Sequence, residues 1–122
     1  VAAIRGFADA EQAPIDFTTA PSLAVPRALQ HAGMTAGDAH LHEINEAFSV
    51  VAMANMQILG LDRENVNVFG GAVSMGHPIG MSGGRIIGTL MNALERKDKE
   101  VGVASICNGG GGASAIVIER LS

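Results

Sequence analysis

The chain has 122 residues and a formal net charge of −4, with 48% hydrophobic and 16% charged residues. This size and composition favour one globular domain with a sizeable core over a disordered chain. The acidic balance and the scarcity of aromatic residues (four Phe, no Tyr, no Trp) argue against a nucleic-acid partner. No apolar run approaches the roughly 18 residues of a membrane span. With Cys107 as the only cysteine, no intramolecular disulfide can form, which favours a reducing compartment.

The first part of the chain predicts a strand, a helix and a second strand. Val1–Ala8 has the apolar pattern of a strand, and Asp9–Thr19 is expected to be a polar loop. Proline is tolerated only in the first turn of a helix, so the next helix is expected to begin near Pro26 and to end at Gly33. Leu41–Ile44 follows as a short strand.

The middle of the chain predicts two helices with a short strand and a loop between them. Glu46–Leu59 is apolar nearly all round, which is typical of a helix buried on more than one side. Val66–Phe69 is expected to be a strand, and Gly70–Gly80 a loop. Ser82 is expected to cap a helix that runs to about Lys97.

Two apolar strands, Val101–Cys107 and Ala113–Arg120, end the pattern and are separated by glycines. Strands joined by so short a connection pair antiparallel. Together with the helices that alternate with the earlier strands, they predict an α/β fold of layers, in which a mixed sheet is covered by helices. We see no linker, so residues 1–122 are expected to form one domain.

The glycine run of Ile106–Gly112 (ICNGGGG) is the most unusual feature of the sequence. Each glycine inside regular structure costs about 0.5–1 kcal/mol relative to alanine, so four together need a compensating use. Close approach of backbone amides to a ligand that develops negative charge is such a use. Cys107 opens the run at the end of a strand, where its thiol could face a cavity. A buried cysteine before a flexible hairpin is the alternative.

His77 lies in a second glycine-rich segment, Gly70–Gly84 (GGAVSMGHPIGMSGG). An imidazole can act as base, acid or hydrogen-bond donor at neutral pH, and glycine neighbours admit close contacts to it. A histidine that braces a turn is the alternative. Two glycine-rich segments that each hold one reactive side chain make the structural explanation less attractive for both.

Other polar residues are more ambiguous. Asn45, in the segment Asn45–Phe48 (NEAF), can hold a water or orient a neighbour, but it can equally be a helix N-cap. His40 and His42 alternate along the short strand and lack partners at metal-ligand spacing. The glycines at 109–112 precede a strand rather than open a helix, unlike a dinucleotide-binding fingerprint.

Taken together, Asn45–Phe48 (NEAF), Gly76–Gly80 (GHPIG) and Cys107–Gly112 (CNGGGG) resemble the three active-site motifs of the thiolases, in the same order. The resemblance covers essentially the whole chain as the C-terminal domain of that family. The residues at Val73–Met75 and Met81–Ser82 are most similar to those of the mitochondrial-type acetoacetyl-CoA thiolases. His42 and Pro26 depart from the residue types expected there.

The resemblance implies a role for each motif. His77 would activate a nucleophilic cysteine and donate to a thioester oxygen, and Asn45 would hold a water that completes this first oxyanion hole. Cys107 would move the proton at the substrate α-carbon, and the Gly109 amide would help to form a second oxyanion hole. The Val73 carbonyl matches a position that contributes to a potassium site in the mitochondrial type.

The family's reaction is the reversible condensation of two acetyl-CoA to acetoacetyl-CoA and CoA, or thiolytic cleavage of a 3-oxoacyl-CoA. Thiolases acylate a different cysteine in an N-terminal domain, so this chain alone is expected to be inactive. The resemblance implies acyl-CoA substrates without a covalently bound cofactor, a dimer or tetramer, and a place in mitochondrial lipid metabolism, with the cytoplasm as the alternative. Two other functions remain open: a related condensing enzyme, which usually has a histidine in place of Cys107, and a non-catalytic lipid-binding or assembly module.

Overall fold

A computed structural model describes all of residues 1–122 and contains one four-stranded sheet in the order β1-β4-β3-β2. Strands β1 and β4 pair antiparallel, as do β4 and β3, whereas β2 and β3 are parallel. The predicted mixed sheet and the antiparallel final pair are therefore confirmed. The strands are β1 (Ala2–Glu11), β2 (Leu41–Ile44), β3 (Val101–Cys107) and β4 (Gly112–Arg120).

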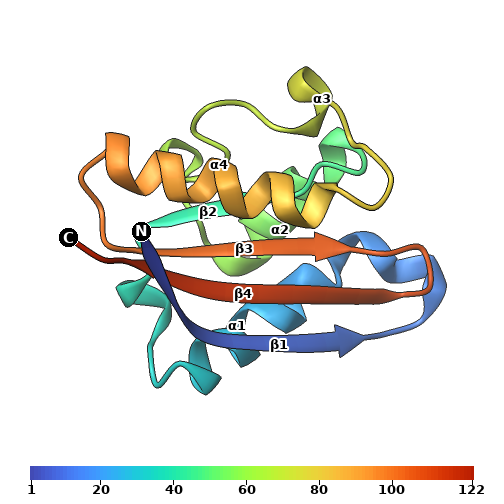
Figure 1. Cartoon of the computed structure of the whole chain (residues 1–122). Helices are drawn as coiled ribbons and strands as arrows, with labels where there is room; N and C mark the ends of the chain where they lie inside the picture. Colours follow the sequence, from blue (N-terminus) through green and yellow to red (C-terminus); the bar gives the residue numbers. More distant parts are fainter.

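Helices cover both faces of this sheet. Figure 1 shows α4 along one face and α1 on the other. Successive side chains of a strand point to opposite faces, so Val103 and Val117 pack in the core cluster under α1, whereas Ala104 and Ile118 pack under α4. The helices are α1 (Pro21–His31), α2 (Ser49–Leu59), α3 (Ala72–Met75) and α4 (Ser82–Arg96), with 3₁₀ turns η1 (Pro14–Thr19), η2 (Ala36–Asp38) and η3 (Arg63–Asn65). None of these helices is long and apolar enough to cross a membrane.

Three predicted elements differ from the structure. The first helix begins at Pro21, not Pro26, because Pro21 takes the first-turn position that suits proline. Pro26 lies inside the helix on its exposed side, where water can serve the carbonyl group that proline leaves without a partner. Strand β1 extends to Glu11 because β4 continues alongside it. Val66–Phe69 is not a strand; it makes only two isolated parallel bridges, from Val66 to His42 and from Val68 to Gly70.

Helix α2 is shorter and less buried than predicted. It begins at Ser49, and only Val51, Ala52 and Asn55 are buried, against β2, β3 and η1. Val50 and Met53, on the opposite side, are exposed, and so is Ile58 near the end of the helix. An apolar helix with one bare side is consistent with a further structure that covers it in a larger protein.

One end of the sheet gathers the segments that the sequence analysis singled out. The carboxyl ends of the parallel strands β2 and β3 meet there, together with α3 and the beginning of α4, whereas both chain termini lie at the other end (Figure 1). In α/β sheets, ligands usually bind beyond the carboxyl ends of the strands. This end is therefore where a site is expected.

Candidate active site

Asn45 is fixed directly after β2 and is fully buried. Its backbone N–H donates to the Ser105 carbonyl oxygen (2.9 Å), and its side-chain Oδ1 accepts from Arg85 Nη2 (3.3 Å). The other end of the amide, Nδ2, lies 3.4 Å from His77 Nε2. Asn45 is not the N-cap of α2, because that helix begins four residues later.

His77 lies on the exposed loop between α3 and α4, and both of its ring nitrogens have partners. Nδ1 makes a short contact with Ser82 Oγ, and Nε2 faces the Asn45 amide. Because an amide nitrogen can only donate, this pairing favours the proton on Nδ1. Ser82 therefore does not cap α4 as predicted; its hydroxyl partners His77 and also donates to the Pro78 carbonyl (3.3 Å). The imidazole is held from two sides, with its ring at the surface.

Cys107 is the last residue of β3 and is buried, with 8% of its surface exposed. Burial raises the pKa of its thiol, which its backbone hydrogen bond only partly opposes, so the protonated thiol predominates at neutral pH. The parallel register pairs Ile44 with Ser105, and this places Cys107 at the same edge of the sheet as Asn45. No hydrogen bond joins Cys107 to Asn45 or His77.

The glycines after Cys107 do not all serve the same purpose. A Cβ on Gly111 would lie 2.2 Å from the Gln12 carbonyl oxygen, and the residue has a φ of +93°, so the hairpin itself requires glycine there. The Gly110 and Gly112 amides donate to Asn108 Oδ1 (3.0 and 3.3 Å). Gly109 differs: it is exposed, no atom crowds its Cβ position, and its amide donates to no group of the chain. Of the four, Gly109 is the one free to meet a ligand.

Comparisons with known proteins identify the family of the chain. The family model described as "Thiolase, C-terminal domain" matches residues 1–120. This chain belongs to the thiolase C-terminal domain family. It is 60% identical over 122 residues to "Acetyl-CoA acetyltransferase 1" of Arabidopsis thaliana, covering all of this chain and 29% of that protein.

Two further relatives show the same partial coverage of a longer protein. "Acetyl-CoA acetyltransferase ERG10, cytosolic" of Gibberella zeae is 57% identical over 121 residues, which cover 99% of this chain and 31% of that protein. The crystal structure of Acat5 thiolase from Ascaris suum in complex with coenzyme A superposes with a TM-score of 0.92 at 51% identity, over 99% of this chain and 31% of that one. The chain thus spans about a third of the length of the relatives that it matches.

Behind the site, this thiolase domain buries a charged pair that the sequence analysis missed. Glu43 of β2 is 1% exposed, and Arg85 Nη1 of α4 lies 3.9 Å from its Oε2. Burial raises the pKa of Glu43 to about 7; the attraction of Arg85 lowers it less than burial raises it, and repulsion from Glu46 adds to the rise. Contacts therefore run from Glu43 through Arg85 and Asn45 to His77. A charged residue inside a four-residue buried strand was the available clue.

Glu46 holds the loop that carries α3 against this region. Its Oε2 accepts the Val73 N–H (3.0 Å), and a Cβ on Gly71 would lie 2.5 Å from the same carboxylate. Glycine at 71 therefore lets the loop lie against the Glu46 carboxylate, which a larger side chain would displace. Val73 itself is exposed, and its carbonyl oxygen accepts no hydrogen bond from the chain. No group of three or more His, Cys, Asp or Glu side chains could hold a metal ion.

Proposed function

We propose that this chain supplies the acid–base and oxyanion half of an acetyl-CoA C-acetyltransferase. The enzyme would condense two acetyl-CoA to acetoacetyl-CoA and CoA, or cleave a 3-oxoacyl-CoA with CoA in the reverse direction. The observation that carries the proposal is the convergence of Asn45, His77 and Cys107 at one end of the sheet. The names of the relatives, acetyl-CoA acetyltransferases at 57–60% identity, support the same reaction.

Each residue takes a role that its environment suits. His77 is restrained at both nitrogens: its bare Nε2 takes the proton of the nucleophilic thiol and, once protonated, donates toward the thioester oxygen, with Asn45 beside it holding a water in the same oxyanion hole. Cys107, as a protonated thiol, moves the proton at the substrate α-carbon. The free amide of Gly109 contributes to the second oxyanion hole.

The domain organisation follows from the same proposal: residues 1–122 form the C-terminal domain, and an N-terminal thiolase domain brings the cysteine that carries the acyl group. Bare apolar surface supports such a partner. Helix α4 covers β2 and β3 but leaves an apolar hollow beside β1 and β4, lined by Phe7, Ile87 and Ile116 among others. On the active-site loops, Ile79 and Val73 are largely exposed. Without the partner the chain should not catalyse thiolysis, because its one cysteine is already used for proton transfer.

The remaining assignments concern the whole protein. Acyl-CoA thioesters are the proposed substrates, and the neighbour from Ascaris suum was crystallised with coenzyme A. A potassium ion at the free Val73 carbonyl and a dimer or tetramer complete the proposal. A mitochondrial location in lipid metabolism rests only on the resemblance of Val73–Met75 and Met81–Ser82 to the mitochondrial-type enzymes. The relative named as cytosolic, at 57% identity, supports the cytoplasm as the alternative.

Substitution of Cys107 tests the proposal in the complete enzyme. In Cys107→Ser, exchange of the α-protons of acetyl-CoA in deuterated water and condensation should both fall severely, because a hydroxyl is a far weaker acid than a thiol. Acylation of the other cysteine, followed as the first-turnover release of CoA, should change much less. Glu100→Gln, an exposed residue before β3 at the other end of the sheet, serves as the control. Equal losses in both half-reactions would contradict the role of Cys107.

The non-catalytic alternative predicts a different result. A lipid-binding or assembly module would show neither half-reaction, and its buried Cys107 would resist alkylation in the assembled protein as a core thiol does. Alkylation of Cys107 that acetyl-CoA prevents would exclude that alternative.

A further inference from the structure

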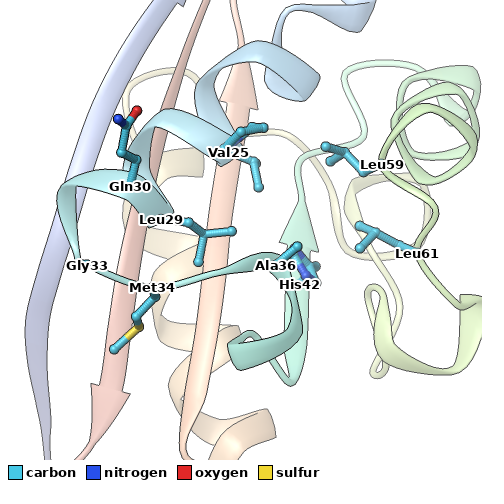
Figure 2. Close-up of a pocket in the computed structure, with 10 residues that line it drawn as sticks. Val25, Leu29, Gln30, Gly33, Met34, Ala36, His42, Leu59 and Leu61 are labelled. Carbon is cyan, nitrogen blue, oxygen red and sulfur yellow. The ribbon is translucent and has the colours of Figure 1, made fainter.

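A cavity of about 330 Å³ lies between α1, the beginning of β2 and the end of α2, on the face of the sheet away from α4. Figure 2 shows Val25 and Leu29 of α1 on one side, Leu59 and Leu61 on the other, and His42 of β2 between them. Asn45, His77 and Cys107 do not line it. The cavity is therefore separate from the candidate active site, although β2 contributes to both.

His42 is the one buried polar side chain of this cavity. It is 4% exposed, and neither of its ring nitrogens has a hydrogen-bond partner. Burial lowers its pKa to about 4, so the ring is neutral near pH 7 and presents one N–H donor and one bare acceptor nitrogen. Buried polar groups are almost always paired, so a ring with both nitrogens unpaired calls for a partner from outside the chain.

The lining restricts the chemistry of that partner. No charged side chain lines the cavity, and the only other polar one is Gln30, on the exposed side of α1. An anion or a cation would lose its hydration there without a counter-charge, which excludes the phosphate-bearing part of coenzyme A. Ligand cavities usually measure about 300–1,000 Å³, so this one suits a small molecule. Apolar cavities of only about 150 Å³ can hold benzene.

We propose that this cavity binds a small uncharged molecule with an apolar body and one hydroxyl group, and that the hydroxyl bonds to His42. A hydroxyl is the group that fits, because it can donate to the bare nitrogen or accept from the N–H, whichever tautomer the ring adopts. The apolar body lies among Val25, Leu29, Leu59 and Leu61. This site is independent of the proposed acyl-transfer function and can be tested whether or not that function holds.

Phenol and toluene form a matched pair of probes, since they share ring and shape and differ in the hydroxyl. Binding of each to the intact protein is measured by ligand-observed NMR titration. Toluene is the more apolar, so a purely apolar cavity would prefer it. We expect phenol to bind about fivefold more tightly, because it alone pairs with His42. In protein labelled with ¹⁵N-histidine, phenol should shift the His42 ring resonances and toluene should not.

Two variants decide the role of the cavity. His42→Phe keeps a flat ring without nitrogens and should reverse the preference, so that toluene binds more tightly than phenol. Leu61→Trp fills the cavity while it keeps His42, and it should abolish binding of both probes. If His42→Phe does not fold, the relative affinities of the wild type for phenol and toluene, and the binding of both probes to Leu61→Trp, still test the proposal. Tighter binding of toluene to the wild type, or no binding of phenol up to its solubility, would overturn the proposal and leave His42 hydrated by water alone.

Discussion

The two sides of strand β2 bury polar side chains in opposite ways. His42 points to the side of α1 and α2, into an apolar cavity, and neither ring nitrogen has a partner. Its neighbour Glu43 points to α4, where Arg85 faces it at 3.9 Å and continues through Asn45 to His77. Two adjacent residues of one strand, both almost fully buried, thus meet very different surroundings.

This difference shows what buried polar groups do in the fold. On the α4 side, the attraction of Arg85 offsets only part of the cost of burying Glu43, whose carboxylate oxygens have no hydrogen-bond partner, but the contacts continue from Arg85 to Asn45 and the exposed ring of His77. On the α1 side the same kind of cost has no internal offset, and the group remains available to a ligand. Substitutions on each side of β2 test this difference.

The largest effect is expected from His77→Ala, at the end of the α4-side network. Loss of one oxyanion donor costs about 10²–10³ in rate. His77→Ala should lower kcat/KM of the complete enzyme by at least that factor, because the imidazole also activates the nucleophile. Asn45→Ala should lose less, since Asn45 acts through a water. Steady-state thiolysis of acetoacetyl-CoA measures both.

Matched cavity-side variants provide the control for this experiment. Met34 lines the His42 cavity, so Met34→Leu should leave thiolysis unchanged. Near-normal turnover in His77→Ala would mean that the histidine only braces its loop through Ser82.

A smaller effect is expected from Arg85→Lys, which keeps the positive charge beside Glu43 but loses the planar fork that reaches Asn45. We expect kcat to fall about tenfold through misplacement of the Asn45 amide, with little change in KM or Tm. Arg85→Met also removes the partner of Glu43, so it should lower Tm as well. Thiolysis kinetics with calorimetry on the same samples separate positioning from stability. If Arg85→Lys lowered Tm together with kcat, the loss of activity would follow from the loss of stability, and Arg85 would have only a structural role.

The sequence predicted the layered fold and its mixed sheet because strands and helices alternate clearly and a short connection forces the last pair to be antiparallel. It brought out the positions of His77 and Cys107 through their unusual glycine neighbours and that of Asn45 through the NEAF motif, while their roles remain proposals. Ser82 was predicted only as a helix cap and Arg85 was not singled out, because from sequence alone each suits an ordinary helical position. Only the three-dimensional contact with His77 and Asn45 distinguishes them.

The predicted boundaries of helices and strands were wrong where contacts with another part of the fold determine them. Glu11 belongs to a strand only because β4 lies beside it, and Val66 lacks the neighbours that would extend its single bridge. The apolar pattern of α2 predicted burial on more than one side, but its second side is bare in this chain. The bare side is consistent with the partner domain proposed above, which the apolar pattern alone could not show.

The smallest expected effect is a pair of opposite pH dependences from the two sides of β2. Burial lowers the pKa of His42 from 6.5 to about 4, so the unfolded state binds more protons between these values and His42 makes stability rise with pH there. Burial raises the pKa of Glu43 from 4.5 to about 7, so the folded state binds more protons and Glu43 makes stability fall with rising pH.

In the wild type these two slopes largely cancel between about pH 4.5 and 6.5, where the windows overlap. Removing one group exposes the other. His42→Phe should leave a Tm that falls as pH rises through this range, and Glu43→Gln should leave a Tm that rises. Calorimetry of the intact protein at closely spaced pH values measures both slopes, and His40→Gln controls for the half-buried neighbouring histidine, whose Nδ1 accepts from the Val101 N–H. Because each variant is compared with itself at another pH, a fixed loss of stability from the substitution does not matter. Slopes of the same sign in the two variants would show that the sides of β2 do not differ as the contacts indicate.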